Sequence, residues 1–207
     1  QDRRDVGRRR VKAFVILVDS REQAPLPFPP FITLLDSHYR ATDRRTLRIP
    51  LVVRKATLGA ADYAPLSAPL AIYSPGTGRP AGIVERKFSI DEVAGNTVTG
   101  DARRANFVAC LKNMRRAWGS RARLLLDGGW GALYHPSSIT LDTACCARDA
   151  LQRLELEYSV PIIPLASHTP TQRARIADWV ARWLINSTLT SEAPELIEPT
   201  PPLASEG

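Results

Sequence analysis

Short apolar runs alternate along this chain with longer segments of helical periodicity, and this alternation constrains the fold more than any other feature. The run AFVILVD at 13–19 is rich in β-branched residues and ends at Asp19, which predicts a strand buried on both faces. Similar strand-like runs lie at 46–55, 68–73, 81–87, 121–129 and 160–166. Pro50 lies within one of them and predicts an edge strand, because proline has no N–H to donate to a sheet.

Helical segments separate these runs. A short helix is predicted near 30–38, and periodic apolar residues predict helices at about 101–118 and 142–158. Two capping boxes mark helix starts, Ser89 with Glu92, and Thr169 with Gln172 ahead of a helix to about Leu184. Strands that alternate with helices predict an α/β fold in which helices cover both faces of a sheet.

The 207-residue chain carries a net charge of +7, unevenly distributed. Residues 1–12 hold six basic side chains and predict a flexible basic arm, whereas residues 187–207 hold four glutamates and no Lys or Arg and predict an acidic, Pro-rich disordered tail. One domain is then expected at 13–186. The basic balance favours a polyanionic partner such as nucleic acid, although a basic surface kept for solubility gives the same balance.

The cysteine pattern and the apolar runs limit the compartment. Three cysteines without CxxC spacing favour neither a disulfide framework nor a zinc site. The longest apolar run, at 13–18, is far shorter than the ~20 residues that span a bilayer. We therefore expect an intracellular protein with no membrane partner.

Acidic and lysine side chains gather at the ends of the predicted strands. Asp19 closes the first strand, Asp62 precedes another, and Glu85 and Lys87 stand where AGIVERK ends. Carboxylates suit the hard cation Mg²⁺, which acidifies a bound water and stabilises charge on a phosphate, while a nearby lysine orients the nucleophile or takes its proton. This layout is typical of metal-dependent nucleases, although such short matches also arise by chance, and each acid has a structural alternative as a loop cap or ion pair.

Three longer segments of the sequence resemble one family of nucleases. ERKFSID, from Glu85 to Asp91, resembles the ERKxxxD signature of the XPF-type structure-specific nucleases, ILVDSREQ resembles that family's first strand with its Asp-x-Arg-Glu, and LGAADYA resembles its Gly-Asp-Tyr segment. The similarity extends over roughly 13–185. It implies a restriction-endonuclease-like fold, a central mixed sheet flanked by helices. It also implies divalent-metal cleavage of DNA near junctions or flaps, and a homodimer or a heterodimer with a related nuclease-fold chain.

The resemblance also assigns roles to residues. It implies catalytic roles for Asp19, Glu22, Asp62, Glu85 and Lys87. It implies Mg²⁺ or Mn²⁺ held by Asp19, Asp62, Glu85 and the backbone carbonyl of Arg86. DNA contacts are expected from Arg21, Arg86, Arg103 and Arg104. The Arg86 side chain is expected on the opposite face of its strand from Glu85 and Lys87, where a structural role is the alternative, and for Arg103 and Arg104 the alternative is a solvated surface. For Asp91, catalysis and a helix-dipole or ion-pair role both stay open.

The chain departs from the family pattern in several places. Ala61 stands where a glycine is usual, and the interval between Asp62 and Glu85 is long enough for an enlarged hairpin around SPGTGRP. No helix-hairpin-helix pair or helicase motif is seen. A stripe of Trp179, Val180, Trp183 and Leu184 predicts self-association.

Alternative functions therefore stay open. The chain could be a catalytically silent DNA-binding module of the same fold, or a phage or bacterial junction resolvase or restriction-like nuclease. The intact acids and Lys87 favour an enzyme that acts on DNA in the nucleus or in a bacterial or phage-infected cytoplasm.

Overall fold

A mixed sheet of seven strands, in the order β2-β3-β1-β4-β5-β6-β7, forms the centre of the protein. The computed structural model describes residues 13–35, 46–66, 82–98, 101–166 and 168–192, so the predicted arm at 1–12 and strand at 68–73 lie outside it. The strands are β1 (Phe14–Asp19), β2 (Phe31–Leu35), β3 (Thr46–Ala56), β4 (Tyr63–Pro65), β5 (Ile83–Lys87), β6 (Ala122–Asp127) and β7 (Ile162–Leu165). The predicted α/β fold with a central mixed sheet is confirmed.

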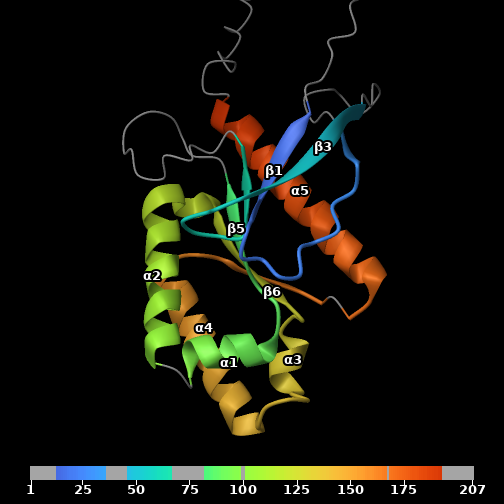
Figure 1. Ribbon diagram of the computed structural model, residues 1–207. Coiled ribbons are helices and arrows are strands. Elements are labelled where there is room, and N and C mark those ends of the chain that lie inside the picture. The colour runs from blue at the N-terminus through green and yellow to red at the C-terminus, as the bar shows by residue number, and fades with distance from the viewer. Residues whose placement is uncertain (1–12, 36–45, 67–81, 99–100, 167, 193–207) are drawn as a thin grey trace, which may run out of the picture.

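Helices cover both faces of this sheet (Figure 1). They are α1 (Ile90–Thr97), α2 (Asp101–Trp118), the 3₁₀ turn Gly119–Arg121, α3 (Gly131–Tyr134), α4 (Leu141–Tyr158) and α5 (Pro170–Glu192). The predicted capping box of Thr169 and Gln172 forms with both of its bonds, whereas Ser89 caps its helix and the Glu92 carboxylate accepts from Phe88 N instead. Ser89 Oγ accepts from Glu92 N at 3.1 Å, and Thr169 and Gln172 exchange bonds between side chain and backbone.

The alternation of side chains along the central strands creates two apolar cores. On one face, Leu17, Ile83 and Leu124 pack against apolar residues of α1, α2 and α4. On the other, Ile16, Val84 and Leu125 pack against α5. Burial on both faces explains why β1 is apolar up to Asp19 and why residues 124–126 of β6 are apolar before Asp127, whereas β5 changes from apolar to charged residues after Val84. No helix within the described ranges is long and apolar enough to cross a membrane.

Two predictions at one end of the sheet are wrong. The segment expected to be a helix near 30–38 begins with β2, which pairs antiparallel with β3. A short apolar run has no period that separates a strand from a helix, and tertiary pairing decides it here. Consequently β3 is not the edge strand that Pro50 suggested. The first half of β3 pairs with β2 and its second half with β1, and Pro50 lies where the partner changes.

The last helix extends further than predicted. α5 continues past Leu184 to Glu192, so residues 187–192, expected in the tail, are helical. Val180 and Leu184 are fully buried against the sheet. Trp179 and Trp183 stack on each other and pack on the same core. The apolar stripe on this helix is therefore largely core, and it no longer supports self-association.

The end of α5 lies against the start of β5. Ser187 Oγ accepts a hydrogen bond of 2.8 Å from the backbone N–H of Gly82, and itself donates to Leu184 O at 2.9 Å. A Cβ on Gly82 would stand 2.6 Å from Ser187 Oγ and 2.9 Å from Trp183 Nε1, closer than packed atoms come. Glycine is therefore required at this crossing.

We predict that Gly82→Ala lowers the free energy of unfolding by about 1–3 kcal/mol, because the new methyl group overpacks this contact. Gly131→Ala is the matched control, since a Cβ there meets nothing within 4 Å. Urea unfolding monitored by circular dichroism measures both. Equal stability of the two variants would contradict the close approach of α5 to β5.

Candidate active site

Asp62 is placed by the short strand β4. This strand runs antiparallel between β1 and β5, so the residue before it lies at the carboxyl ends of both neighbours. Its backbone joins them, because Asp62 O accepts from Asp19 N at 2.9 Å and Asp62 N donates to Val84 O at 3.0 Å. The turn before it needs Ala61 in the left-handed region, at φ 74°, which explains why the resembled family uses glycine there.

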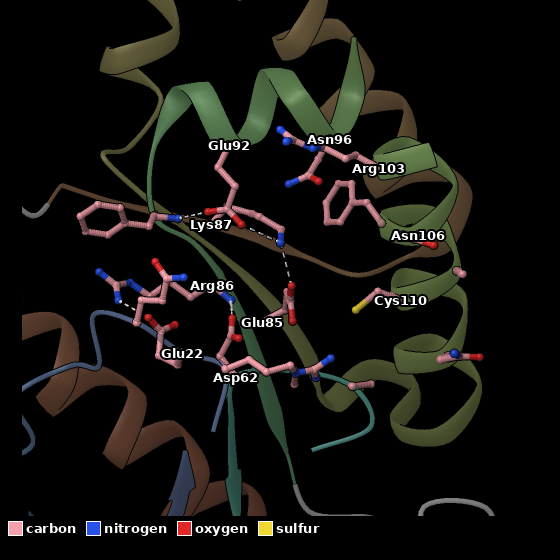
Figure 2. A pocket seen from close by; sticks show the side chains of 18 of the residues that line it. Glu22, Asp62, Glu85, Arg86, Lys87, Glu92, Asn96, Arg103, Asn106 and Cys110 are labelled. Atoms are coloured by element: carbon pink, nitrogen blue, oxygen red, sulfur yellow. Dashed lines mark hydrogen bonds and ion pairs between the residues drawn. The ribbon is translucent and has the colours of Figure 1, made fainter. Parts of the chain in front are cut away.

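Glu85 and Lys87 lie on one face of β5, two residues apart. Lys87 Nζ donates to Glu85 Oε1 at 2.8 Å and to Glu92 Oε1 at 3.1 Å. Asp62 joins them because its Oδ2 accepts a 2.7 Å hydrogen bond from the backbone N–H of Arg86 (Figure 2). All these side chains line one pocket of about 810 Å³, whose far wall is α2.

Burial and neighbouring charges shift the pKa values of Asp62 and Lys87 in this pocket. Burial and the neighbouring charge of Glu85 raise the pKa of Asp62 to about 8. Burial alone would lower the pKa of Lys87, but Glu85 and Glu92 outweigh it and raise the pKa above its ordinary value. Lys87 therefore stays protonated near neutral pH. It donates hydrogen bonds to both glutamates.

The carboxylates of this pocket suit Mg²⁺, which keeps several waters, better than a metal ion whose ligands all come from the protein. The described part of the chain contains no group of three or more His, Cys, Asp or Glu side chains close enough to hold a metal. Asp62 and Glu85 nevertheless supply two carboxylates on the pocket wall. Mg²⁺ is commonly held by one or two carboxylates together with waters and substrate phosphates. Burial and the charge of Glu85 both disfavour the ionised form of Asp62 and raise its pKa, and a bound cation would offset both effects.

Asp19 is not brought to the pocket. Its carboxylate is buried and accepts bonds from Arg21 Nη2 at 2.6 Å and Arg21 N at 2.8 Å. Although burial raises the pKa of Asp19, these bonds lower it below its ordinary value. Arg21 also donates to Leu58 O at 2.8 Å, so this ion pair ties the end of β1 to the loop before Asp62. The structure favours a positioning role over the metal-ligand role that the sequence suggested.

Arg86 points away from Glu85 and Lys87, as predicted, but it cannot contact DNA. Its side chain is completely buried and forms an ion pair with Asp127, donating from Nε at 2.9 Å. It also donates to Ala24 O at 2.6 Å and lies 3.7 Å from Glu22 Oε1. We therefore assign this guanidinium a structural role. Glu22 lines the pocket and accepts from Ala24 N at 2.9 Å.

The remaining predicted residues divide by position. Arg21 and Arg103 line the pocket, whereas Arg104 lies outside it on the exposed side of α2. Asp91 is exposed, outside the pocket, and accepts a 2.8 Å hydrogen bond from Ser138 Oγ, so it ties α1 to the loop before α4.

Sequence reasoning missed several pocket residues. Glu92 was identified only as part of a capping box, yet its carboxylate positions Lys87 and accepts from Phe88 N at 2.8 Å. Its place five residues after Lys87, on the first turn of the following helix, is the signal that could have found it. Nothing in the sequence singles out the amides on α1 and α2, namely Asn96, Asn106 and Asn113.

We predict that Asp127→Asn destabilises the protein by about 3–5 kcal/mol, because it leaves the buried Arg86 charge without its main partner. Asp178→Asn is the control. It breaks an ion pair with Arg182 that is about 40% exposed, and such pairs contribute at most about 1 kcal/mol. Urea unfolding compares them. A loss below about 1 kcal/mol for Asp127→Asn would show that Arg86 is held by its other acceptors.

Comparisons with known proteins give one distant structural match. No protein-family model matches the chain, and no curated protein matches it. Among solved structures, XPF from Aeropyrum pernix is similar, with 17% sequence identity and a TM-score of 0.46. The alignment covers 81% of this chain and 63% of that chain, so this chain spans less than two thirds of the length of that protein.

Proposed function

We propose that this protein is a divalent-metal-dependent DNA endonuclease. The observation that carries the proposal is the juxtaposition of Asp62, Glu85 and a protonated Lys87 in one pocket, at the carboxyl ends of β1 and β5. Two buried acids that repel each other, beside a fixed cation, suit a reaction in which negative charge develops on a phosphate.

Each residue has a distinct role in the proposed reaction. Asp62 and Glu85 would hold Mg²⁺ or Mn²⁺, with the Arg86 carbonyl as a further ligand. When bound, the cation supplies an acidified water and charge neutralisation at the phosphate. Lys87, held by Glu85 and Glu92, donates a hydrogen bond to the attacking water or to a phosphate oxygen. Arg21 and Arg103, on the pocket walls, bind flanking phosphates.

The substrate is DNA that carries a branch or a flap. This part of the proposal rests on the resemblance of ERKFSID and ILVDSREQ to the XPF-type nucleases. Labelled flap, fork, four-way junction and plain duplex, each with and without Mg²⁺, separate a structure-specific nuclease from a general one. No cutting of any of them in Mg²⁺ or Mn²⁺, together with intact DNA binding, would instead identify a silent binding module.

We predict that Asp62→Asn, Glu85→Gln and Lys87→Ala each reduce cleavage about 100-fold or more, because each removes charge stabilisation from the reacting phosphate. DNA binding, measured by fluorescence anisotropy, is retained. The carboxylate variants lose metal affinity, whereas Lys87→Ala keeps it, since a cation is not a ligand. Asp91→Asn, an exposed acid outside the pocket, is the control and cuts at the parent rate. Cleavage by Glu85→Gln close to the parent rate would reject the proposed site.

The raised pKa of Asp62 predicts a pH-dependent metal affinity. Because the ion binds the ionised carboxylate, Mg²⁺ affinity measured by calorimetry increases about tenfold per pH unit below about 8 and levels off above it. Without metal, the folded protein binds this proton more tightly than the unfolded chain, so the stability that the proton contributes is fully present below the ordinary pKa of 3.8, falls as pH rises toward about 8, and is lost above it.

Asp62→Asn is expected to remove both dependences and to raise the melting temperature of the metal-free protein at pH 8. A gain of about 1 kcal/mol corresponds to about 2–4 °C for a chain of this size. Mg²⁺ affinity that stays constant between pH 6 and 8 would show that Asp62 is not a ligand.

A further inference from the structure

Phe88 is an exposed aromatic side chain at the edge of the pocket. It follows Lys87 directly, lines the pocket, and leaves 50% of its surface open to solvent. It belongs to neither apolar core of the described residues. A phenylalanine with half its surface in water gains only part of the free energy of a fully buried ring, so the exposed half is available to a ligand in the pocket.

The backbone and the ring of Phe88 both contact groups that are fixed within the fold. The backbone N–H of Phe88 donates to Glu92 Oε2 at 2.8 Å, and the Arg86 guanidinium lies 4.9 Å from the ring centroid. Arg86 is itself fixed by Asp127 and by the carbonyl of Ala24. An aromatic ring held in this way loses little conformational entropy when a flat ligand stacks on it.

The surroundings indicate which flat ligand fits. Phe88 shares the pocket with cations and amides, Arg21, Lys87, Arg103 and Asn96 among them, rather than with other exposed apolar side chains. Of the two aromatic rings that line the pocket, Phe107 is buried and Phe88 is exposed. A mixture of charge and an exposed aromatic ring is typical of sites that bind a phosphate backbone and stack on a base. Inside a duplex the stacked neighbours cover both faces of a base, whereas an unpaired base can leave the stack and offer a face.

We propose that Phe88 stacks on an unpaired nucleobase next to the phosphate that reacts at the site of Asp62 and Glu85. This proposal rests on the proposed nuclease function and deepens it. It makes Phe88 a specificity-determining residue that selects DNA with single-stranded nucleotides at the site.

Binding in a Glu85→Gln background of the full chain tests the proposal without cutting. Affinities are measured by fluorescence anisotropy for a duplex with a single-stranded tail and for the same duplex with blunt ends. We expect Phe88→Ala to weaken binding to the tailed duplex about tenfold, the effect of losing one stacked base, and to leave the blunt duplex unchanged. Phe88→Trp keeps the affinity. Phe88→Leu does not restore it, since it keeps the apolar surface without the aromatic face.

Phe31 provides a matched control. It is 38% exposed and carries Arg48 3.6 Å from its ring centroid, so it resembles Phe88 in exposure and in its cation, but it lies on β2 outside the pocket. Phe31→Ala is expected to leave both affinities unchanged. Thermal melting of all variants confirms that each one folds.

An abasic nucleotide identifies the stacked position. Removing the base at one position of the tail should weaken binding to the Glu85→Gln protein that keeps Phe88 about tenfold. It should have no effect on binding to the protein that also carries Phe88→Ala. Equal losses on tailed and blunt duplex, or abasic effects that persist in Phe88→Ala, would overturn the proposal. A change of oligomeric state in light scattering, with no change in affinity for DNA, would also overturn it and assign Phe88 to a protein interface. If the parent binds and cuts DNA in these outcomes, only the role of Phe88 fails.

Discussion

A buried guanidinium holds the candidate active site together. Arg86 contacts Asp127 at the end of β6, Ala24 in the loop after β1, and Glu22, while its backbone N–H binds Asp62. The buried guanidinium cannot move far from Asp127, because a buried charge that loses its ion-pair partner is strongly destabilising. One residue of β5 thus fixes β6, the loop after β1 and Asp62 relative to Glu85 and Lys87, its neighbours on the opposite face.

The acids of this region divide into two classes by their partners. Asp19 and Asp127 each have an arginine bonded to them within the fold, so their charge is neutralised before any ligand arrives. Asp62 accepts from the backbone N–H of Arg86, has no arginine side chain bonded to it among the described residues, and faces the charge of Glu85. The fold therefore concentrates its unbalanced negative charge at one point, next to the single ammonium of Lys87. This division separates acids that build the site from acids that are available to a cation.

The sequence predicted the part of this arrangement that depends on neighbours along the chain. Glu85, Lys87 and the helix start at Ser89 follow from ERKFSID, because strand alternation and a capping box are local. The pairing of Asp19 with Arg21 could not be predicted, because an acid at the end of an apolar strand has the same sequence pattern whether an arginine or a metal binds it. The strands β2 and β4 were missed, since one is a short apolar run and the other has only three residues and needs both neighbours to exist. Which amides of α2 face the pocket depends on helix packing, which no local pattern encodes.

The left-handed Ala61 has a consequence for local unfolding. A residue with a side chain at φ 74° is disfavoured by about 1 kcal/mol or more. The next residue, Asp62, is buried beside the charge of Glu85. The free protein therefore stores unfavourable energy in residues 58–62, and this loop should open more readily than the sheet that it joins. A cation that binds only the closed loop would suppress that opening by mass action. Slower hydrogen exchange of the amides of Ala61 and Asp62 would then report occupancy of the site, even where the rest of the sheet exchanges as before.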